Sequence, residues 1–321
     1  MAILRSKSLE SIEGLLKSYD KHHQALWVKP KDDKVDEIIV FGPYGQVGLA
    51  VIRLALSLGI KVCSVLHRRS VSFSHPLFRQ VKKAELKKVF SGGDKKVVFT
   101  GPINKIKEYA EILEDTSHII CFSSTSKFTK SLSSSKFYKN IVKDFEEGEK
   151  YIDETAAKVD FKFNIIRPTL IYGFGIDSNI SALVKFIKKY KVLPVYKDAC
   201  GLRQPVHVED LANSVLSLFN NGSKTYNKAY NLSGGETLTY YAMVERIFET
   251  LDSHPIIVGT RFLPILMDIG GKLVGSNVVH REVALNMEKD FTFSHKDATK
   301  DFRYKPRDFL DNGIMDISPI N

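Results

Sequence analysis

The chain has 321 residues, of which 43% are hydrophobic, and its 47 Lys and Arg against 37 Asp and Glu give a formal net charge of +10. This length and composition can bury a large core, and we expect one Rossmann-like domain with a smaller lobe. No apolar run is long enough to span a bilayer, and the first residues lack the apolar core of a signal peptide. The three cysteines are far apart, which argues against disulfides or a zinc site and favours a cytoplasmic protein.

The basic balance can indicate nucleic acid or an anionic membrane as partner. The lysines, however, are scattered in pairs such as 82–83 and 188–189, mostly in helix-like segments with acids between them. We find no basic arm and no aromatic-rich RNA motif, so solvated helix faces are favoured over nucleic-acid binding. Attraction to anionic small molecules or to a membrane surface remains open.

The first 36 residues precede the first predicted strand. Apolar residues at helical spacing predict an accessory helix, and a charged run after it predicts a linker. Residues 37–41 then form a short strand rich in Ile and Val. This strand ends at Gly42, where the most informative stretch of the chain begins.

Glycines recur at every third position after this strand, at Gly42, Gly45 and Gly48, and a helix-like apolar pattern follows over 46–58. A strand, a tight glycine turn and a helix place backbone N–H groups where a pyrophosphate can bind. Gly42 can adopt turn dihedrals that other residues avoid, Gly45 lets the ligand approach the backbone, and Gly48 lets the helix pack on the strand. A purely structural glycine turn is the alternative, but the matching strand and helix favour a nucleotide site.

Strands and helices alternate from this point to residue 175. The predicted strands are 60–66, 95–100, 118–122 and 161–167, and the predicted helices are 81–90, 104–114 and 139–159. We place no clear strand between residues 71 and 95. The alternation predicts a doubly wound parallel sheet with helices on both faces, in the α/β class.

The pattern changes after Gly175. A smaller α+β lobe is predicted from 176–203 and 236–321, while 204–235 returns to the dinucleotide-binding domain of 37–175. The expected elements after residue 175 are helices over 179–190, 209–220 and 239–251 and short strands over 204–208, 229–232 and 256–258. The apolar stretch 262–275 is interpreted as a packed helix pair, with a substrate lid or a membrane-touching surface as alternatives.

Five segments, in this order, resemble the extended short-chain dehydrogenase/reductase proteins, in particular the group of sugar-nucleotide epimerases and dehydratases. The resemblance covers roughly residues 37–309. The segments are the glycine pattern of 42–48, the strand end IICFSST of 119–125, IRPTLIYG of 166–173, RQPVHVEDLA of 203–212 and YNLSGGE of 230–236.

The resemblance implies a nicotinamide dinucleotide as cofactor. The strand of 60–66 is followed by Arg68 and Arg69 where an NAD enzyme has an acid, which favours NADP, although both arginines could simply be solvated. The implied cofactor contacts are Gly42, Tyr44, Gly45, Gln46, Val47, Gly48, Arg68, Arg69, Thr100, Gly101, Pro102, Ser123 and Pro168.

For the substrate, the resemblance implies a nucleoside-diphosphate sugar or a related glycosylated phosphate. Arg203 matches an arginine that binds the pyrophosphate, a task suited to a planar guanidinium. Asn179 matches a polar contact to the substrate, with an N-cap of the next helix as an equally weighted alternative. Ser124 or Thr125 would contact the reacting sugar oxygen. No metal ligand set is expected.

The pattern breaks at the proton-transfer pair, a tyrosine and a lysine four residues later on the helix after the fifth strand of the family. None of the thirteen tyrosines has a lysine four residues on. Tyr138 and Lys143 are five apart, which on a helix turns their side chains away from each other. Lys127 and Lys130 are other candidates for a proton route.

The favoured interpretation is an epimerase or keto-sugar reductase, with surface-polysaccharide synthesis as the expected pathway by analogy. The second hypothesis, a dinucleotide-binding sensor or partner subunit without turnover, follows from the missing pair. The resemblance also implies a possible homodimer, formed through the helices of 104–114 and 139–159.

Overall fold

The computed structural model describes residues 35–66, 71–92, 94–131, 133, 135–273 and 281–318, with residues 14 and 16, and only the backbone of 271–273. Apart from residues 14 and 16, the predicted accessory helix therefore lies outside the described residues. Arg68 and Arg69 also lie outside them. None of the helices in the described part is long and apolar enough to cross a membrane.

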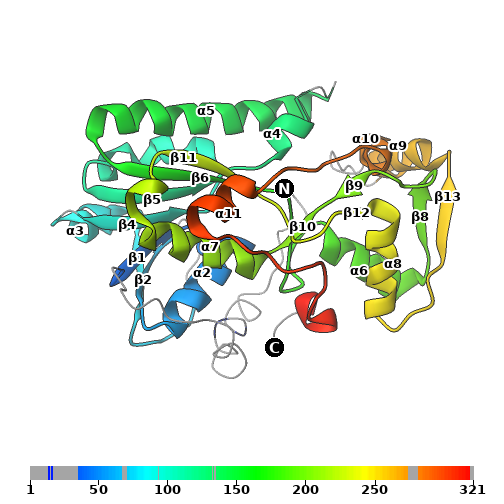
Figure 1. The fold of residues 1–321 in the computed structure, drawn as a ribbon, viewed down its shortest axis with the longest axis horizontal. Coiled ribbons are helices and arrows are strands. Elements are labelled where there is room, and N and C mark those ends of the chain that lie inside the picture. Colours follow the sequence, from blue (N-terminus) through cyan, green and yellow to red (C-terminus); the bar gives the residue numbers. More distant parts are fainter. Residues whose placement is uncertain are drawn as a thin grey trace.

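A seven-stranded sheet forms the larger part of the molecule (Figure 1). Its order is β11-β6-β5-β4-β1-β2-β3, and every neighbouring pair is parallel. The strands are β1 (Glu37–Phe41), β2 (Lys61–Leu66), β3 (Phe78–Lys82), β4 (Lys95–Phe99), β5 (Thr116–Phe122), β6 (Lys162–Pro168) and β11 (Lys228–Leu232). The predicted α/β class and parallel sheet are confirmed.

Helices cover both faces of this sheet, because side chains alternate along each buried strand. On one face lie α2 (Gln46–Ser57), α7 (Val208–Asn220) and α11 (Lys296–Phe302), which share a core with Ile38 and Val40. On the other lie α3 (Leu86–Phe90), the 3₁₀ helix η3 (Ile103–Ile112) and α5 (Lys136–Val159), which share a core with Ile39 and Phe41. Both faces of β1 are therefore buried.

One local prediction was wrong, and a second was right about a helix but not about its type. The segment predicted to be helical from 81 begins as strand β3, then forms a 3₁₀ turn, η2 (Lys83–Glu85), and only then α3. The strand was missed because β3 lies at the edge of the sheet, where its residues are mostly half-exposed and polar. The predicted helix of 104–114 is η3, a 3₁₀ segment with a non-helical residue at Tyr109.

A second lobe packs around a small parallel sheet of β8 (Leu193–Tyr196) and β13 (Ile257–Thr260). Its core contains residues of β8 together with α6 (Ile180–Tyr190), α8 (Tyr240–Thr250), α9 (Leu263–Leu273) and α10 (Arg281–Leu285). Short pairs formed by β7 (Leu170–Tyr172) with β10 (Pro205–His207), and by β9 (Leu202–Arg203) with β12 (Leu238–Thr239), connect this lobe to the large sheet. The short helix α4 (Ser126–Thr129) and the 3₁₀ turns η4 (Gly222–Lys224), η5 (Asn286–Glu288) and η6 (Gly313–Asp316) complete the described elements.

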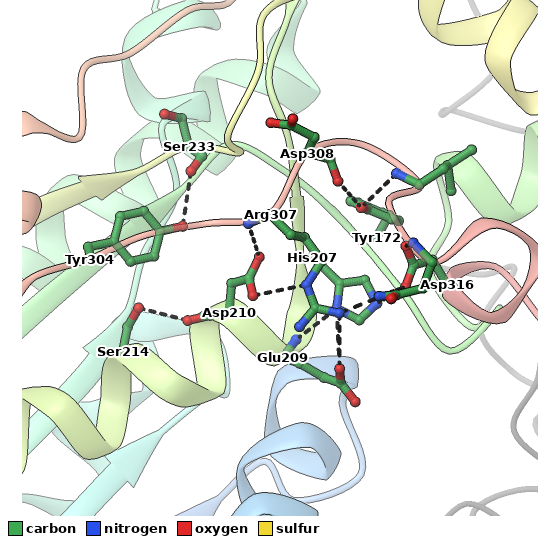
Figure 2. Close-up of polar contacts among 12 residues, drawn as sticks. Tyr172, His207, Glu209, Asp210, Ser214, Ser233, Tyr304, Arg307, Asp308 and Asp316 are labelled. Carbon is green, nitrogen blue, oxygen red and sulfur yellow. Dashed lines mark hydrogen bonds and ion pairs between the residues drawn. The ribbon is translucent and has the colours of Figure 1, made fainter. Parts of the chain in front are cut away.

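A buried polar network ties the last part of the chain to the start of α7 (Figure 2). The Arg307 backbone N–H and Nε donate to the Asp210 carboxylate at 3.0 and 3.1 Å, and its Nη1 lies 3.2 Å from Glu209. Burial raises the pKa of Asp210, although Arg307 acts in the opposite direction. His207 Nε2 lies 3.6 Å from Asp316. The His207–Asp210 part of the fourth motif thus anchors the C-terminal segment.

Candidate dinucleotide and substrate site

The candidate site lies at the carboxyl ends of the parallel strands. The chain runs outward from β1 through β2 to β3, then returns to place β4 on the other side of β1. Ligands of open α/β sheets bind at such a switch point. Gly42 follows β1 and Thr100 follows β4, so both predicted segments meet there.

Two glycines of the turn are required by the fold itself. Gly42 has φ +72°, and a Cβ there would lie 2.8 Å from the Gly101 nitrogen. A Cβ on Gly48 would lie 2.4 Å from the Gly42 carbonyl oxygen. Because neither contact is tolerable, these positions accept only glycine for structural reasons.

Gly45 differs from its two neighbours. Its φ is −74°, and a Cβ there would meet only the Gly42 carbonyl oxygen, at an ordinary 3.5 Å. Packing therefore does not require glycine at this position. Gly45 is the N-cap of α2, and α2 carries no acidic residue in its first turn. A helix N-terminus with no side chain above it fits a pyrophosphate.

The segment after β4 holds this turn in place. The Thr100 hydroxyl donates to the Phe41 and Gly42 carbonyls, each at 2.9 Å. Gly101 is half-buried beside the turn, and Pro102 is exposed at the start of η3. The predicted cofactor-binding segment after β4 is therefore adjacent to the glycine turn. The Thr100 hydroxyl stabilises that turn.

The side chains of the turn point to different neighbours. The Tyr44 hydroxyl donates to Gln80 on β3 at 2.5 Å, and the Gln46 amide donates to the Gly173 carbonyl at 2.9 Å. Val47 is buried in the core. Gln46 thus connects the turn to the end of the predicted 166–173 segment.

A lysine that we did not predict lies at the carboxyl end of β3, beside the end of β2. Parallel pairing places Lys82, the last residue of β3, beside Leu66, the last residue of β2. Lys82 is exposed. It was missed because β3 itself was missed. Recognition of β3 would have placed this cation at the same end of the sheet as Leu66.

The hydroxyls that follow β5 differ in their bonding. Ser123 is buried and donates to Glu149 at 2.5 Å. The Thr125 hydroxyl is buried and donates to the Pro168 carbonyl at 3.0 Å. Ser124 is half-buried, and its oxygen accepts the Ser126 N–H at 3.0 Å. An accepted bond leaves the Ser124 hydroxyl proton to donate, so Ser124 is the better placed of the two predicted hydroxyls to polarise a carbonyl.

A charged cluster lies directly behind these hydroxyls. Glu149 on α5 accepts from Lys127 at 2.5 Å and from Arg167 through two bonds at 3.0 and 2.6 Å. Burial acts to raise the pKa of Glu149, but the hydrogen bonds from Arg167, Lys127 and Ser123 outweigh it and hold that pKa below its ordinary value. We missed Glu149 because an acid on a polar helix resembles a solvated one. Its pairing with an arginine before Pro168 becomes visible only in three dimensions.

The proposed Tyr138–Lys143 pair is not formed. Tyr138 lies in the first turn of α5 and is 8% exposed, whereas the Lys143 side chain is 72% exposed and pairs with Glu147. Lys130 lies over the Tyr138 ring instead, with Nζ 4.5 Å from the centroid. Burial lowers the pKa of Lys130 and raises that of Tyr138. A lysine and a tyrosine therefore meet here, although their spacing in the sequence differs from that of the family pair.

Asn179 occupies the N-cap position of α6, as the alternative predicts, but its side chain makes no capping hydrogen bond. Asp177 takes this role, because its carboxylate accepts the Asn179 and Ser181 backbone N–H groups at 2.9 and 3.0 Å. The Asn179 side chain is exposed before α6. Its predicted substrate contact remains a prediction.

Arg203 is almost fully buried, and its guanidinium is already engaged. It donates to the carbonyls of Leu202, Lys289 and Asn286 and stacks on Phe291 at 4.4 Å. Burial lowers the pKa of Arg203 to about 10. In this conformation a pyrophosphate would have to replace some of these carbonyls, so the predicted role of Arg203 requires a rearrangement.

These features define a Rossmann-like α/β fold with a candidate dinucleotide site at its switch point. No protein-family model matches the chain. Among curated proteins, it is 25% identical over 171 residues to UDP-glucose 4-epimerase of Vibrio cholerae, covering 52% of this chain and 49% of that protein. The chain thus matches about half the length of this relative.

Solved structures are similar over nearly the whole chain. An epimerase from Methanothermobacter thermautotrophicus aligns with a TM-score of 0.68 at 15% identity, covering 95% of this chain and 94% of the other. UDP-glucuronic acid 4-epimerase of Bacillus cereus, solved with UDP-glucuronic acid and NAD, aligns with a TM-score of 0.65 at 14% identity, covering 88% and 98%. The predicted fold, that of sugar-nucleotide epimerases and dehydratases, is confirmed.

Proposed function

We propose that the protein is a nicotinamide-dinucleotide-dependent enzyme that epimerises a nucleoside-diphosphate sugar or reduces a keto-sugar. One observation carries this proposal: the glycine turn, Thr100 and the Ser123–Thr125 run lie at the carboxyl ends of the neighbouring strands β1, β4 and β5. The sequence relative and the structures just described are named as epimerases, which agrees with it.

Gly45 and the N-terminus of α2 would hold the cofactor pyrophosphate, since the turn leaves room there that packing does not need. Gly101 and Pro168 would lie along the ribose and nicotinamide. The bound dinucleotide supplies hydride transfer. Arg68, Arg69 and Lys82 favour the 2′-phosphate of NADP, although the B. cereus neighbour was solved with NAD.

Ser124 would donate its hydroxyl proton to the reacting sugar oxygen, while Thr125 keeps its bond to Pro168 and fixes the backbone. A hydroxyl is a weak acid at neutral pH. Lys130, whose pKa burial lowers, stands beside Tyr138 and is the candidate to carry the proton onward. Glu149 would position Ser123 and the end of β6 without itself reacting.

The proposed substrate is a sugar nucleotide because the V. cholerae relative and the B. cereus neighbour are named for UDP-sugars. Asn179 and a rearranged Arg203 would contact it. We further propose a cytoplasmic location and a homodimer. The location follows from the three separated cysteines, and the homodimer follows from the family resemblance.

The test is incubation of the purified protein with NADH or NADPH and a panel of UDP-sugars and UDP-keto-sugars, with absorbance and product chromatography as readouts. Turnover that falls at least about a hundredfold in Ser124→Ala and survives in Tyr138→Phe supports the Ser124 route. Tight dinucleotide binding without turnover of any compound in the panel would favour the sensor hypothesis over an enzyme. Failure to bind either dinucleotide would refute both.

A further inference from the structure

The outer face of α9 is apolar along its exposed side. Phe262, just before the helix, and Ile265, Leu266 and Ile269 within it are between 52% and 69% exposed. Their spacing of three and four residues places them on one stripe. The opposite side of α9 is packed, since Leu263 is buried in the core of the second lobe. We call these four residues the α9 stripe.

The α9 stripe lies near a second exposed apolar area. Strand β13 leads directly into α9 and lies at the edge of its two-stranded sheet, at the outer end of the second lobe (Figure 1). Ile256 and Val258, on and just before this strand, are nearly half exposed. Strand edges with apolar side chains are normally covered or charged in water-soluble proteins. Here exposed apolar side chains lie both on β13 and on α9, the element that follows it in the chain.

A strongly basic segment borders this surface. Residues 178–197, which include α6 and β8, contain no Asp or Glu. They carry five exposed lysines, which are Lys185, Lys188, Lys189, Lys191 and Lys197. Strand β8 of this segment lies directly beside β13, since the Leu193 N–H donates to the Ile256 carbonyl at 2.9 Å and the Lys197 N–H to the Thr260 carbonyl at 3.4 Å.

Exposed aromatic rings accompany the lysines. Phe186 and Tyr190 on α6 are 38% and 51% exposed, with ring centroids 4.6 Å apart, and Lys189 Nζ lies 4.9 Å from the Tyr190 ring. A surface that binds a bilayer combines lysines that attract anionic headgroups, aromatic rings at the interface and an apolar helix face.

We propose that the outer end of the second lobe docks on an anionic lipid bilayer, with the α9 stripe inserted at the interface and the α6 lysines on the headgroups. This site is separate from the dinucleotide site and does not depend on the proposed function. A second copy of the chain fits the surface less well, because self-association would bring two lysine-rich segments together. A bilayer supplies the opposite charge.

The test is flotation of the full chain with vesicles of phosphatidylcholine alone or mixed with phosphatidylglycerol. We expect binding to the mixed vesicles, weakened by high salt. Lys188→Gln/Lys189→Gln/Lys191→Gln should weaken it about a hundredfold, since each lysine near an anionic surface contributes about a factor of five. Leu266→Gln/Ile269→Gln should weaken it at least about tenfold.

Two matched controls separate a local surface from general stickiness. Lys87→Gln/Lys88→Gln/Lys158→Gln removes the same charge from the other lobe, and Ile314→Gln/Met315→Gln removes apolar groups of similar exposure. Both controls should bind as the parent does, and melting curves verify that each variant is folded. The proposal is overturned if the parent does not float with anionic vesicles, or if controls and test variants behave alike. It is also overturned if sedimentation shows a dimer that Leu266→Gln/Ile269→Gln dissociates, since the face then serves a second copy.

Discussion

The two ends of the candidate site are built in different ways. At the ends of β1 and β4, the chain uses glycines and main-chain atoms, and the Thr100 hydroxyl fixes the turn with bonds of 2.9 Å. At the ends of β5 and β6, it uses a buried carboxylate, Glu149, held by two cations. At the first end, packing leaves room above Gly45, whereas the second end is a buried ionic cluster behind the hydroxyls.

The first prediction separates structural from ligand-serving glycines. Gly48→Ala places a Cβ 2.4 Å from a backbone oxygen and should destabilise the fold by about 3 kcal/mol or more. Gly45→Ala meets only an ordinary contact and should melt within a few degrees of the parent while losing most of its dinucleotide affinity. Calorimetry and a binding titration of both variants measure this. If the two variants lose the same stability, packing requires glycine at position 45 as well, and Gly45 is then not kept free for a ligand.

The second prediction concerns the second end. Glu149→Gln leaves Lys127 and Arg167 partly buried without their carboxylate, and should lower the free energy of unfolding by about 3 kcal/mol. Glu154→Gln, which removes an exposed partner of Lys150, should change it by less than about 1 kcal/mol. Denaturant titrations of Glu149→Gln and Glu154→Gln measure the two losses. Similar midpoints for the two variants would show that the Glu149 cluster does not stabilise the fold.

The pH dependence of this variant follows from the sign of the shift. The folded-state pKa of Glu149 lies below its ordinary 4.5, so its stabilisation is present above that pH and is lost as pH falls through the lowered folded value. Melting temperatures from pH 6 downward should therefore decline less steeply in Glu149→Gln than in the parent.

Much of the first end could be predicted from the sequence, and little of the second end. Gly42, Gly45 and Gly48 could be recognised because glycine repeated at this spacing between a strand and a helix is typical of a phosphate-binding turn. Glu149 lies 18 residues from Arg167 in the chain and resembles any helix-surface acid. Strand β3 was missed since edge strands need not be apolar, and Lys82 was missed with it. Likewise, only the folded arrangement reveals that Asp177 caps α6 in place of Asn179.

The third prediction addresses the opposite end of β5. Burial lowers the pKa of His118 to about 4, although its hydrogen bond to Asn164 acts the other way. The unfolded chain therefore binds a proton near pH 6.5 that the fold excludes, and stability present above pH 6.5 falls by roughly 3 kcal/mol as pH drops toward 4. His118→Gln should flatten the pH profile of unfolding over this window, and the exposed His254→Gln should not. Parallel profiles for His118→Gln and the parent would contradict this.

The smallest effect is expected at the adenosine end. Lys82→Ala should weaken NADP binding about tenfold and leave NAD binding unchanged, since only the 2′-phosphate would meet this ammonium. Lys88→Ala, on the neighbouring α3, is the control. Equal effects on both dinucleotides would remove Lys82 from the site and return the choice of cofactor to Arg68 and Arg69.

The position of β11 also has a consequence for how the protein is made. This strand completes the edge of the sheet by pairing with β6, yet the chain builds α6 and β8 of the second lobe between the two. Arg307, further on, joins Asp210 at the start of α7. During synthesis the sheet stays incomplete until residue 232 has left the ribosome, and Asp210 of α7 stays without its partner until Arg307 follows. The two lobes should therefore mature together after translation and unfold in a single calorimetric transition.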